Sequence, residues 1–387
     1  MSASGFFATC PRGLEPALAR ELAACGAADP TAVGGGVRFA GDLAVCYRAN
    51  LESRIASRVL LRVAHGAYAT EQDVYEAGRA IRWADWFDVD RSIRVDVGAT
   101  RSPLRSLEFA TLRIKDAVCD RFRADVGRRP DVDTRAPGVR IHAYLDERSI
   151  TLYLDTSGEP LWKRGARADP GEAPLRENLA AGILALAGWT LDEPLLDPMC
   201  GSGTFLAEAA AIAHRIAPGA RRQFGFERLR NFDSALWTRL REAARARELP
   251  PRPRALYGAD RDPAALARAT RTLAQLGLAA AVRLERADVL EIAAPGGAGV
   301  LVANPPYGVR IGEDATLAAF YPKLGDALKA RFVGWRCYIL SADLRLAKLI
   351  GLKASRRTPL FNGALECRLF EYRIVAGGMR RARPASG

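Results

Sequence analysis

Apolar and polar residues follow two different periods along the first 155 residues of the chain. Over residues 93–97, Ile and Val alternate with Arg and Asp, which is the period of a half-buried strand. Over residues 107–126 apolar side chains recur every three or four positions, as in a helix with one buried stripe. Strands are predicted over residues 6–9, 36–40, 93–97, 139–145 and 150–154, and helices over 14–24 and 107–126. This region is therefore expected to be a mixed α+β module.

The pattern changes after residues 157–174, a polar stretch rich in Gly and Pro that is typical of a linker. Beyond it, short apolar runs alternate with long helical patterns or with Gly/Pro loops. Strands are predicted over residues 195–197, 255–260, 282–284, 300–303 and 337–340. Strands that alternate with helices indicate a parallel α/β sheet with crossover connections. Residues 1–160 are accordingly expected to fold and bind their partner without this second region.

The stretch 221–254 carries ten Arg against four acidic residues and interrupts the second region. Its composition predicts an insertion rather than a core element. Two roles remain open for it, a solvated face or a surface that contacts phosphates.

The charge balance narrows the class of partner. Basic residues outnumber acidic ones by 57 to 44, a net charge of +13, which attracts polyanions and favours nucleic acid. The seven Cys are an odd number without a Cys-x-x-Cys pair, and only three His occur, so neither a disulfide framework nor a metal site is predicted. The longest apolar stretch, 179–189, is too short to span a membrane, and no signal peptide is recognisable. We therefore expect a cytoplasmic chain.

A glycine turn follows the first strand of the second region. Asp197 ends that strand, and Cys200, Gly201, Gly203 and Thr204 form the turn and the start of a helix. A dehydrogenase turn would need Gly or Ala where Leu206 stands, and a P-loop would need Gly-Lys-Ser/Thr. A carboxylate before the turn repels a pyrophosphate but suits a cationic ligand such as S-adenosylmethionine.

Two further carboxylates follow the next two strands. Asp260 ends the second strand, a position from which a carboxylate can accept hydrogen bonds from both hydroxyls of a ribose. Asp288 follows the third strand and is predicted to meet the adenine amino group, although a solvated strand end explains it equally well.

The sequence Asn304-Pro305-Pro306-Tyr307 directly follows an apolar strand. The two prolines remove two backbone donors and stiffen the turn, so that its carbonyls only accept hydrogen bonds. The amide oxygen of Asn304 and the carbonyl of Pro305 are predicted to accept both hydrogens of an exocyclic amine and to aim its lone pair at a methyl group. Tyr307 offers a face on which a flipped base can stack.

Other candidate side chains are interpreted as structural. His65, His142 and His214 follow no ligand spacing and are expected at the surface or in packing. A nucleophilic Cys200 would indicate methylation at C5 of a pyrimidine, but no base partner accompanies it in the sequence. Cys200 is therefore expected to contact the cofactor at most.

These motifs resemble those of class I methyltransferases that methylate an exocyclic nitrogen. Further segments resemble RNA guanine-N2 methyltransferases with a THUMP domain, most closely those that act on 23S ribosomal RNA. These segments are Gly13-Leu14-Glu15, Gly35 to Phe39, Val132-Asp133, Ala173 to Leu179, Asn362-Gly363 and Leu365 to Cys367. The resemblance covers nearly the whole chain.

The resemblance implies a ferredoxin-like subdomain at 1–58, a THUMP RNA-binding domain at 59–156, a linker at 157–174 and a Rossmann-like methyltransferase domain at 175–387. It further implies S-adenosylmethionine as cofactor and ribosomal RNA, 23S or its precursor particle, as substrate, with no metal, membrane or obligate protein partner. Some bacterial relatives are fused to a guanine-N7 methyltransferase, whereas this chain stops after a short basic tail, so N2 activity alone is implied.

The candidate site residues are Asn304, Pro305, Pro306 and Tyr307 for catalysis; Asp197, Cys200, Gly201, Gly203, Thr204, Asp260 and Asp288 for the cofactor; and Lys163 and Arg164 for RNA. Three alternatives stay open: a tRNA guanine-N2 methyltransferase, a DNA adenine-N6 methyltransferase, and a non-catalytic RNA-binding assembly factor. Complete cofactor and Asn-Pro-Pro-Tyr motifs argue against the last of these.

Overall fold

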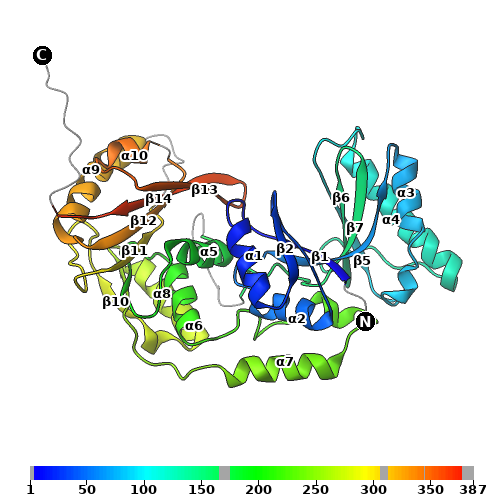
Figure 1. Cartoon of the computed structure of the whole chain (residues 1–387), viewed down its shortest axis with the longest axis horizontal. Coiled ribbons are helices and arrows are strands. Elements are labelled where there is room, and N and C mark those ends of the chain that lie inside the picture. Colours follow the sequence, from blue (N-terminus) through cyan, green and yellow to red (C-terminus); the bar gives the residue numbers. More distant parts are fainter. Residues whose placement is uncertain (1–3, 165–174, 306–312, 344, 377–387) are drawn as a thin grey trace, which may run out of the picture. The chain divides into compact units, whose positions relative to one another are not determined.

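The computed structural model describes residues 4–164, 175–305, 313–343 and 345–376 (Figure 1). The chain divides into two compact units. The N-terminal unit comprises Met1–Cys10, Leu18–Leu161 and Gly219–Ala243, and the C-terminal unit comprises Pro11–Ala17, Trp162–Pro218 and Ala244–Gly387.

A seven-stranded sheet with the order β2-β3-β1-β4-β7-β6-β5 forms the N-terminal unit. Its strands are β1 (Ser4–Thr9), β2 (Ala28–Val33), β3 (Gly36–Gly41), β4 (Arg58–Ala67), β5 (Ile93–Ala99), β6 (Val139–Leu145) and β7 (Ser149–Asp155). The helices in this part of the chain are α1 (Glu15–Ala24), α2 (Leu43–Glu52), α3 (Glu71–Arg79), η1 (Trp83–Asp85) and α4 (Leu107–Val126). The predicted mixed α+β class is confirmed, and the predicted helix over 107–126 coincides with α4.

Strand β4 joins the two predicted subdomains into one sheet. It pairs with β1 on one side and with β7 on the other, both antiparallel. The sequence boundary between residues 58 and 59 therefore falls at the first residues of a central strand. The two halves share main-chain hydrogen bonds across this strand, so they form one continuous structure.

The Arg-rich stretch returns to the N-terminal unit. Most of it lies in the segment Gly219–Ala243 of that unit, which includes η2 (Gly225–Arg228) and most of α7 (Ser234–Ala246), whereas residues 244–254 belong to the C-terminal unit. Phe224, Phe226 and Trp237 are almost fully buried there. The ring of Tyr47 stacks on Phe226 at 4.3 Å and meets the edge of Trp237 at 5.9 Å between centroids. The interpretation of 221–254 as an insertion outside the core was wrong, because its aromatic side chains complete a core.

Hydrogen bonds tie the same stretch to the end of β7 and the residues after it. Arg222 donates to the carbonyl oxygens of Ser157, Glu159 and Pro160, and the amide of Phe226 donates to the carbonyl of Thr156 at 2.9 Å. An isolated fragment 1–160 would leave these groups and the aromatic cluster without partners. The expectation that residues 1–160 form an independent module is therefore corrected.

The C-terminal unit contains a second seven-stranded sheet, with the order β10-β9-β8-β11-β12-β14-β13. Its strands are β8 (Leu195–Asp197), β9 (Leu256–Asp260), β10 (Arg283–Arg286), β11 (Gly299–Ala303), β12 (Trp335–Ser341), β13 (Arg356–Asn362) and β14 (Leu365–Arg373). Its helices include α5 (Glu177–Ala187), α6 (Thr204–Ala213), α8 (Pro263–Leu276), η3 (Ala279–Ala281), α9 (Glu313–Arg331) and α10 (Leu346–Leu349). Strands β8 to β12 are parallel, as predicted, and β14 is antiparallel to β12.

The chain order reverses between β8 and β11, which are neighbours in this sheet. From β8 the chain continues to β9 and β10 toward one edge of the sheet, and from β11 it continues to β12 toward the other edge. In such sheets ligands bind beyond the carboxyl ends of the strands at this reversal. The Gly turn follows β8 and the Asn-Pro-Pro-Tyr motif follows β11, so both motifs begin at this point. Among the described helices, none is both long and apolar enough to cross a membrane.

Candidate active site

The glycine turn leaves β8 at Asp197 and enters α6 at Thr204, which is buried. Gly201 and Gly203 have φ angles of 54° and 77°, in the region that favours glycine. A Cβ on Gly203 would lie 3.1 Å from the Cβ of Ala269 on α8, whereas a Cβ on Gly201 would meet no protein atom within 4 Å. Gly203 thus lets α6 pack on α8, and Gly201 presents its backbone to open space.

Asp260 links the end of β9 to this turn. Its Oδ2 accepts the amide hydrogen of Gly201 at 3.0 Å, and its Oδ1 accepts that of Asp262 at 3.0 Å. Because Asp197 pairs with Gly258 across the sheet, Asp260 lies two residues beyond the β8 end. A carboxylate has about four lone-pair sites, so two backbone donors leave acceptor capacity on each oxygen.

Asp197 is 2% exposed, and its environment disfavours its charge. Burial raises the pKa of Asp197 to about 8; the amide of Met199 opposes this shift, and the negative charge of Asp260 adds to it. Among the described residues, no positive charge contributes to the pKa shift of Asp197. A positively charged ligand would relieve both the burial and the repulsion.

The raised pKa predicts how Asp197 affects stability. In an unfolded chain this carboxyl ionises near 3.8, so between about pH 4 and pH 8 the folded protein keeps a proton that the unfolded chain has lost. Its contribution to stability therefore falls as the pH rises through this window. We expect Asp197→Asn to raise the free energy of unfolding at pH 8.5 by on the order of 2–5 kcal/mol and to change it little at pH 4.

Urea denaturation of the full chain at the two pH values measures this effect. Asp192→Asn is the matched control, because Asp192 is an exposed carboxylate before the same strand. An equal change for both variants at pH 8.5 would contradict a protonated, buried Asp197.

Cys200 is buried in the turn, and burial raises the pKa of its thiol well above the ordinary value of 9.0. The nearby charges of Asp197 and Asp260 act in the same direction. The thiolate that a nucleophile requires is therefore disfavoured, which supports the structural interpretation of Cys200.

Asn304 and Pro305 follow β11 on the neighbouring strand. Leu301 pairs with Leu196, one residue before Asp197, and Ala303 pairs with Ile339 on β12. Asn304 is half-buried and Pro305 is buried. Pro306 and Tyr307 lie outside the described residues.

Asp288 lies beyond the end of β10, whose last residue, Arg286, pairs with Asp260. It is half-buried, and its Oδ1 accepts the amide hydrogen of Leu290 at 2.9 Å. The structure therefore brings Asp197, Asp260, Asp288 and Asn304 to the carboxyl ends of four adjacent parallel strands.

Arg164 has a different environment from the one that an RNA contact requires. Its side chain is 8% exposed, and its Nε donates to Oε1 of Glu208 on α6 at 3.0 Å. A buried guanidinium held by a buried carboxylate is not available to phosphates, so the assignment of Arg164 to RNA is corrected. Sequence reasoning overlooked Glu208, the one acidic residue of the otherwise apolar α6, which signals a buried ion pair.

Lys163 precedes this ion pair and stays a candidate for RNA contact. Its Nζ lies 6.0 Å from the ring centroid of Trp162, and the guanidinium of Arg176 lies 5.0 Å from the same centroid. In the described part of the chain, no three His, Cys, Asp or Glu side chains gather as a metal ion would require.

The doubly wound sheet and its row of strand-end residues define an enzyme domain of the Rossmann-like class. Comparison with protein families matches residues 164–371 to the "RMKL-like, methyltransferase domain" family, which covers more than half of the chain. The chain therefore belongs to the RMKL-like methyltransferase family. Residues 5–60 match the "RlmL ferredoxin-like domain" and residues 68–155 match the "THUMP domain".

Two of its relatives are the proteins named ribosomal RNA large subunit methyltransferase K/L from Aeromonas salmonicida and Syntrophotalea carbinolica. They are 41% and 42% identical over 96% of this chain. The match covers 54% and 53% of those proteins, so the chain spans about half the length of the curated relatives it matches.

Two solved structures with the same fold cover nearly the whole chain. SMU.472, described as a methyltransferase complexed with SAH, is 28% identical with a TM-score of 0.87, covering 99% of this chain and 100% of its own. A Listeria monocytogenes protein, described as a predicted N6-adenine-specific DNA methylase, is 30% identical with a TM-score of 0.86, covering 97% of each chain.

Proposed function

We propose that this chain transfers a methyl group from S-adenosylmethionine to the exocyclic N2 of a guanine in 23S ribosomal RNA. The observation that carries this proposal is the row of strand ends, in which a carboxylate pair for a cationic cofactor lies beside Asn304 and Pro305. The names of the relatives support ribosomal RNA as the substrate, and the match to a THUMP domain supports RNA binding. The described chain contains one such site, so a single methylation is assigned to it.

The residues of the turn fit S-adenosylmethionine. A cationic ligand would favour the ionised form of Asp197, whose carboxylate would then face the methionine ammonium and sulfonium. The open side of Gly201 leaves room for the ligand, and Asp260 retains lone pairs for ribose hydroxyls. Cys200, Gly203, Thr204 and Asp288 complete the proposed binding set. When bound, S-adenosylmethionine supplies an electrophilic methyl group.

The acceptor side requires no ionised side chain. The Asn304 amide oxygen and the Pro305 carbonyl each accept one hydrogen of the guanine amine, which otherwise delocalises its lone pair into the ring. Two fixed acceptors favour the pyramidal amine and stabilise the positive charge that develops on the nitrogen. Pro305 has no N–H, so no competing donor arises there. Pro306 and Tyr307 are proposed to stiffen the loop and to stack on the flipped base.

Asn-Pro-Pro-Tyr selects an exocyclic amine rather than guanine itself, so tRNA guanine-N2 and DNA adenine-N6 remain the alternative acceptors. The description of the Listeria monocytogenes relative names the second of these. The charge of +13 and the THUMP match favour RNA. We further propose that the chain acts in the cytoplasm and without an obligate protein partner.

Asp260→Ala is expected to weaken the binding of S-adenosylhomocysteine by at least about 100-fold. The substitution removes acceptors for two ribose hydroxyls and the bond that holds Gly201, and bonds to a charged group contribute about 1.5–3 kcal/mol each. Isothermal titration of the full chain measures the affinity, with Asp192→Ala as the control for loss of a carboxylate. Equal affinities of the two variants for S-adenosylhomocysteine would show that Asp260 does not contact the ribose.

A further inference from the structure

The sheet of the N-terminal unit has two faces of different character. Strand residues alternate between the faces, and one set, which includes Phe6, Val37, Leu61 and Leu152, is buried in the core. The other face also carries exposed or half-buried aromatic and basic side chains. We call five of them, Phe7, Arg38, Arg62, His65 and Tyr153, the platform.

Strand register places the members of the platform on one face. Phe7 on β1 pairs with Arg38 on β3, and Arg62 on β4 pairs with Tyr153 on β7. Directly paired residues of antiparallel strands point to the same side. The two pairs also share that side, because Phe7 pairs with Leu60, two residues before Arg62. The rings of Phe7 and Tyr153 lie 6.2 Å apart between centroids.

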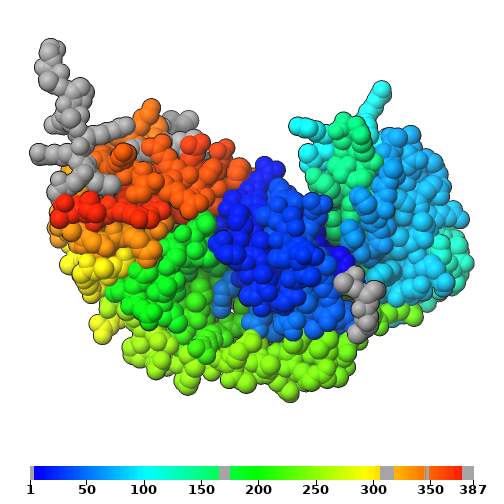
Figure 2. Space-filling view, in the orientation of Figure 1, coloured from blue at the N-terminus to red at the C-terminus, as the bar shows by residue number. Residues whose placement is uncertain are grey.

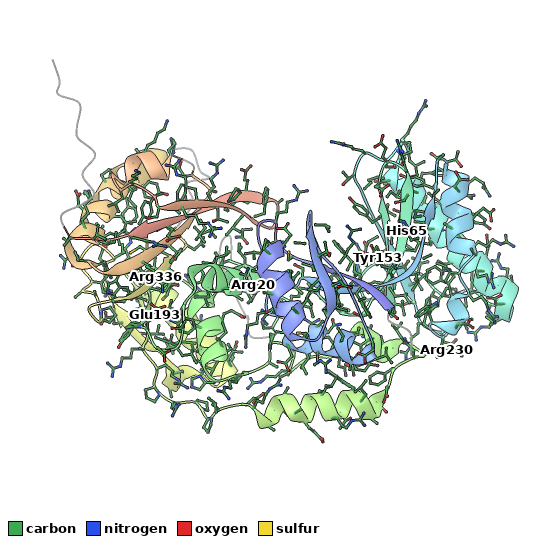
Figure 3. All side chains as sticks on the ribbon, viewed as in Figure 1. Arg20, His65, Tyr153, Glu193, Arg230 and Arg336 are labelled. Atoms are coloured by element: carbon green, nitrogen blue, oxygen red, sulfur yellow. The ribbon has the colours of Figure 1, made fainter. Side chains whose placement is uncertain are left out.

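His65 belongs to the same face, because it pairs with Thr151, two residues before Tyr153. Its Nδ1 lies 3.0 Å from the Thr151 hydroxyl. Figure 3 shows His65 and Tyr153 on the side of the sheet away from α3 and α4. In Figure 2 the surface is hollowed between the blue residues of β2 and β3 and the green-cyan residues of β6 and β7.

The two platform arginines carry uncompensated charge. Arg38 and Arg62 are exposed, and neither forms an ion pair within the described residues. Elsewhere on this face, Arg94 pairs with Asp96 at 2.7 Å and Arg140 with Glu159 at 3.4 Å.

Both guanidinium groups of the platform interact electrostatically with the hydroxyl of Tyr153. Burial raises the pKa of Tyr153, and the positive charges of Arg62 and Arg38 oppose that rise, which places both within electrostatic reach of its hydroxyl. Because neither arginine of the platform forms an ion pair within the described residues, the platform is suited to a ligand that has negative charge and flat rings together.

We propose that the platform binds an unpaired stretch of the RNA that the enzyme methylates, with bases against Phe7 and Tyr153 and phosphates at Arg38 and Arg62. Unpaired nucleotides present their ring faces to aromatic side chains, whereas a duplex keeps them stacked. An acidic peptide would satisfy the arginines but would leave the two rings unused. The proposal rests on RNA as the substrate and adds where, and in which form, the RNA is held.

Fluorescence anisotropy with the full chain and a labelled single-stranded 12-nucleotide RNA tests the platform. Arg38→Ala and Arg62→Ala are each expected to weaken binding about fivefold at 0.1 M salt and to lower the slope of log affinity against log salt by about 0.7. Arg20→Ala is the matched control, because Arg20 is an exposed arginine of the same unit on α1 (Figure 3). It should bind as the unaltered chain does.

Phe7→Leu keeps most of the apolar volume and removes the ring. We expect it to weaken single-strand binding about tenfold, with a smaller effect on a duplex of the same sequence. Circular dichroism melts of each variant verify that the unit remains folded. Rescue by Phe7→Tyr, which restores a ring, separates stacking from a general packing defect.

The platform would be refuted if Arg38→Ala and Arg62→Ala bound the single-stranded RNA as tightly as Arg20→Ala does. This conclusion would hold whatever the result of the methylation assay. Equal weakening for RNA and for a polyglutamate peptide, with no effect of Phe7→Leu, would also overturn the platform, in favour of a surface for anions in general. If Arg38→Ala and Arg62→Ala weaken RNA binding but the unaltered chain methylates no ribosomal RNA, the result would support the platform and refute the proposed function.

Discussion

Asn304→Ala is expected to lower the single-turnover rate of methyl transfer by about 100- to 1,000-fold while leaving the affinity for S-adenosylhomocysteine within about threefold. The amide oxygen follows β11 and is assigned to the acceptor amine, whereas the carboxylates assigned to the cofactor follow β8, β9 and β10. Loss of the amide therefore removes an interaction that strengthens as the amine becomes positively charged. Rapid-quench assays with saturating enzyme measure the rate, and titration calorimetry measures the affinity.

Asn304→Asp serves as the companion variant, because it keeps an acceptor oxygen in the same place and nearly the same volume. It should retain more activity than the alanine variant. Near-normal transfer by Asn304→Ala would refute the proposed role of Asn304, and an equal loss of cofactor affinity in both variants would place Asn304 in the cofactor site.

The second large effect concerns the stretch Gly219–Ala243. A fragment of residues 1–161 should fail to form a cooperatively folded unit, whereas the same fragment joined to residues 219–243 by a Gly/Ser linker should fold. The aromatic contacts of Tyr47 with Phe226 and Trp237 exist only in the second fragment. The join is sterically simple, since Arg222 donates to the Pro160 carbonyl at 2.8 Å.

Urea denaturation followed by near-ultraviolet circular dichroism compares the two fragments. Within the joined fragment, Trp237→Ala should cost about 3–5 kcal/mol, because Trp237 is 4% exposed. Thr238→Ala, at the exposed neighbouring position, should cost little. Equal stability of the two fragments would show that the returning stretch contributes nothing to the unit.

Local patterns predicted the elements that carry the site. Strands β8 and β9 are short, mostly apolar runs that end at Asp197 and Asp260, and β11 ends directly before Asn304. Each predicted strand therefore led to a predicted site residue. Helix α4 was predicted with its observed bounds from the helical period of its apolar residues. In the structure Ser106 caps its start and Gly127, with φ of 73°, ends it.

The missed elements have no comparable local signal. Edge strand β2 lacks alternation because most of its residues are exposed and a register shift interrupts its pairing. Central strand β4 begins with the buried residues Val59, Leu60 and Leu61, which lack alternation because successive side chains point to opposite faces and both faces are covered there. The packing of Gly219–Ala243 against the N-terminal unit depends on contacts between residues far apart in the sequence, such as Tyr47 and Phe226. The ion pair of Arg164 and Glu208 joins residues 44 positions apart. Composition and local spacing do not reveal such contacts.

The identity of the methylated nucleoside is the most direct test of the proposed function. Protein-free 23S ribosomal RNA from a strain that lacks the enzyme is incubated with the full chain and tritiated S-adenosylmethionine, then digested and separated into nucleosides. The proposal predicts about one methyl group per RNA molecule, recovered as N2-methylguanosine, and almost none with bulk tRNA or duplex DNA at the same salt concentration. Label in N6-methyladenosine, or label in tRNA alone, would contradict it.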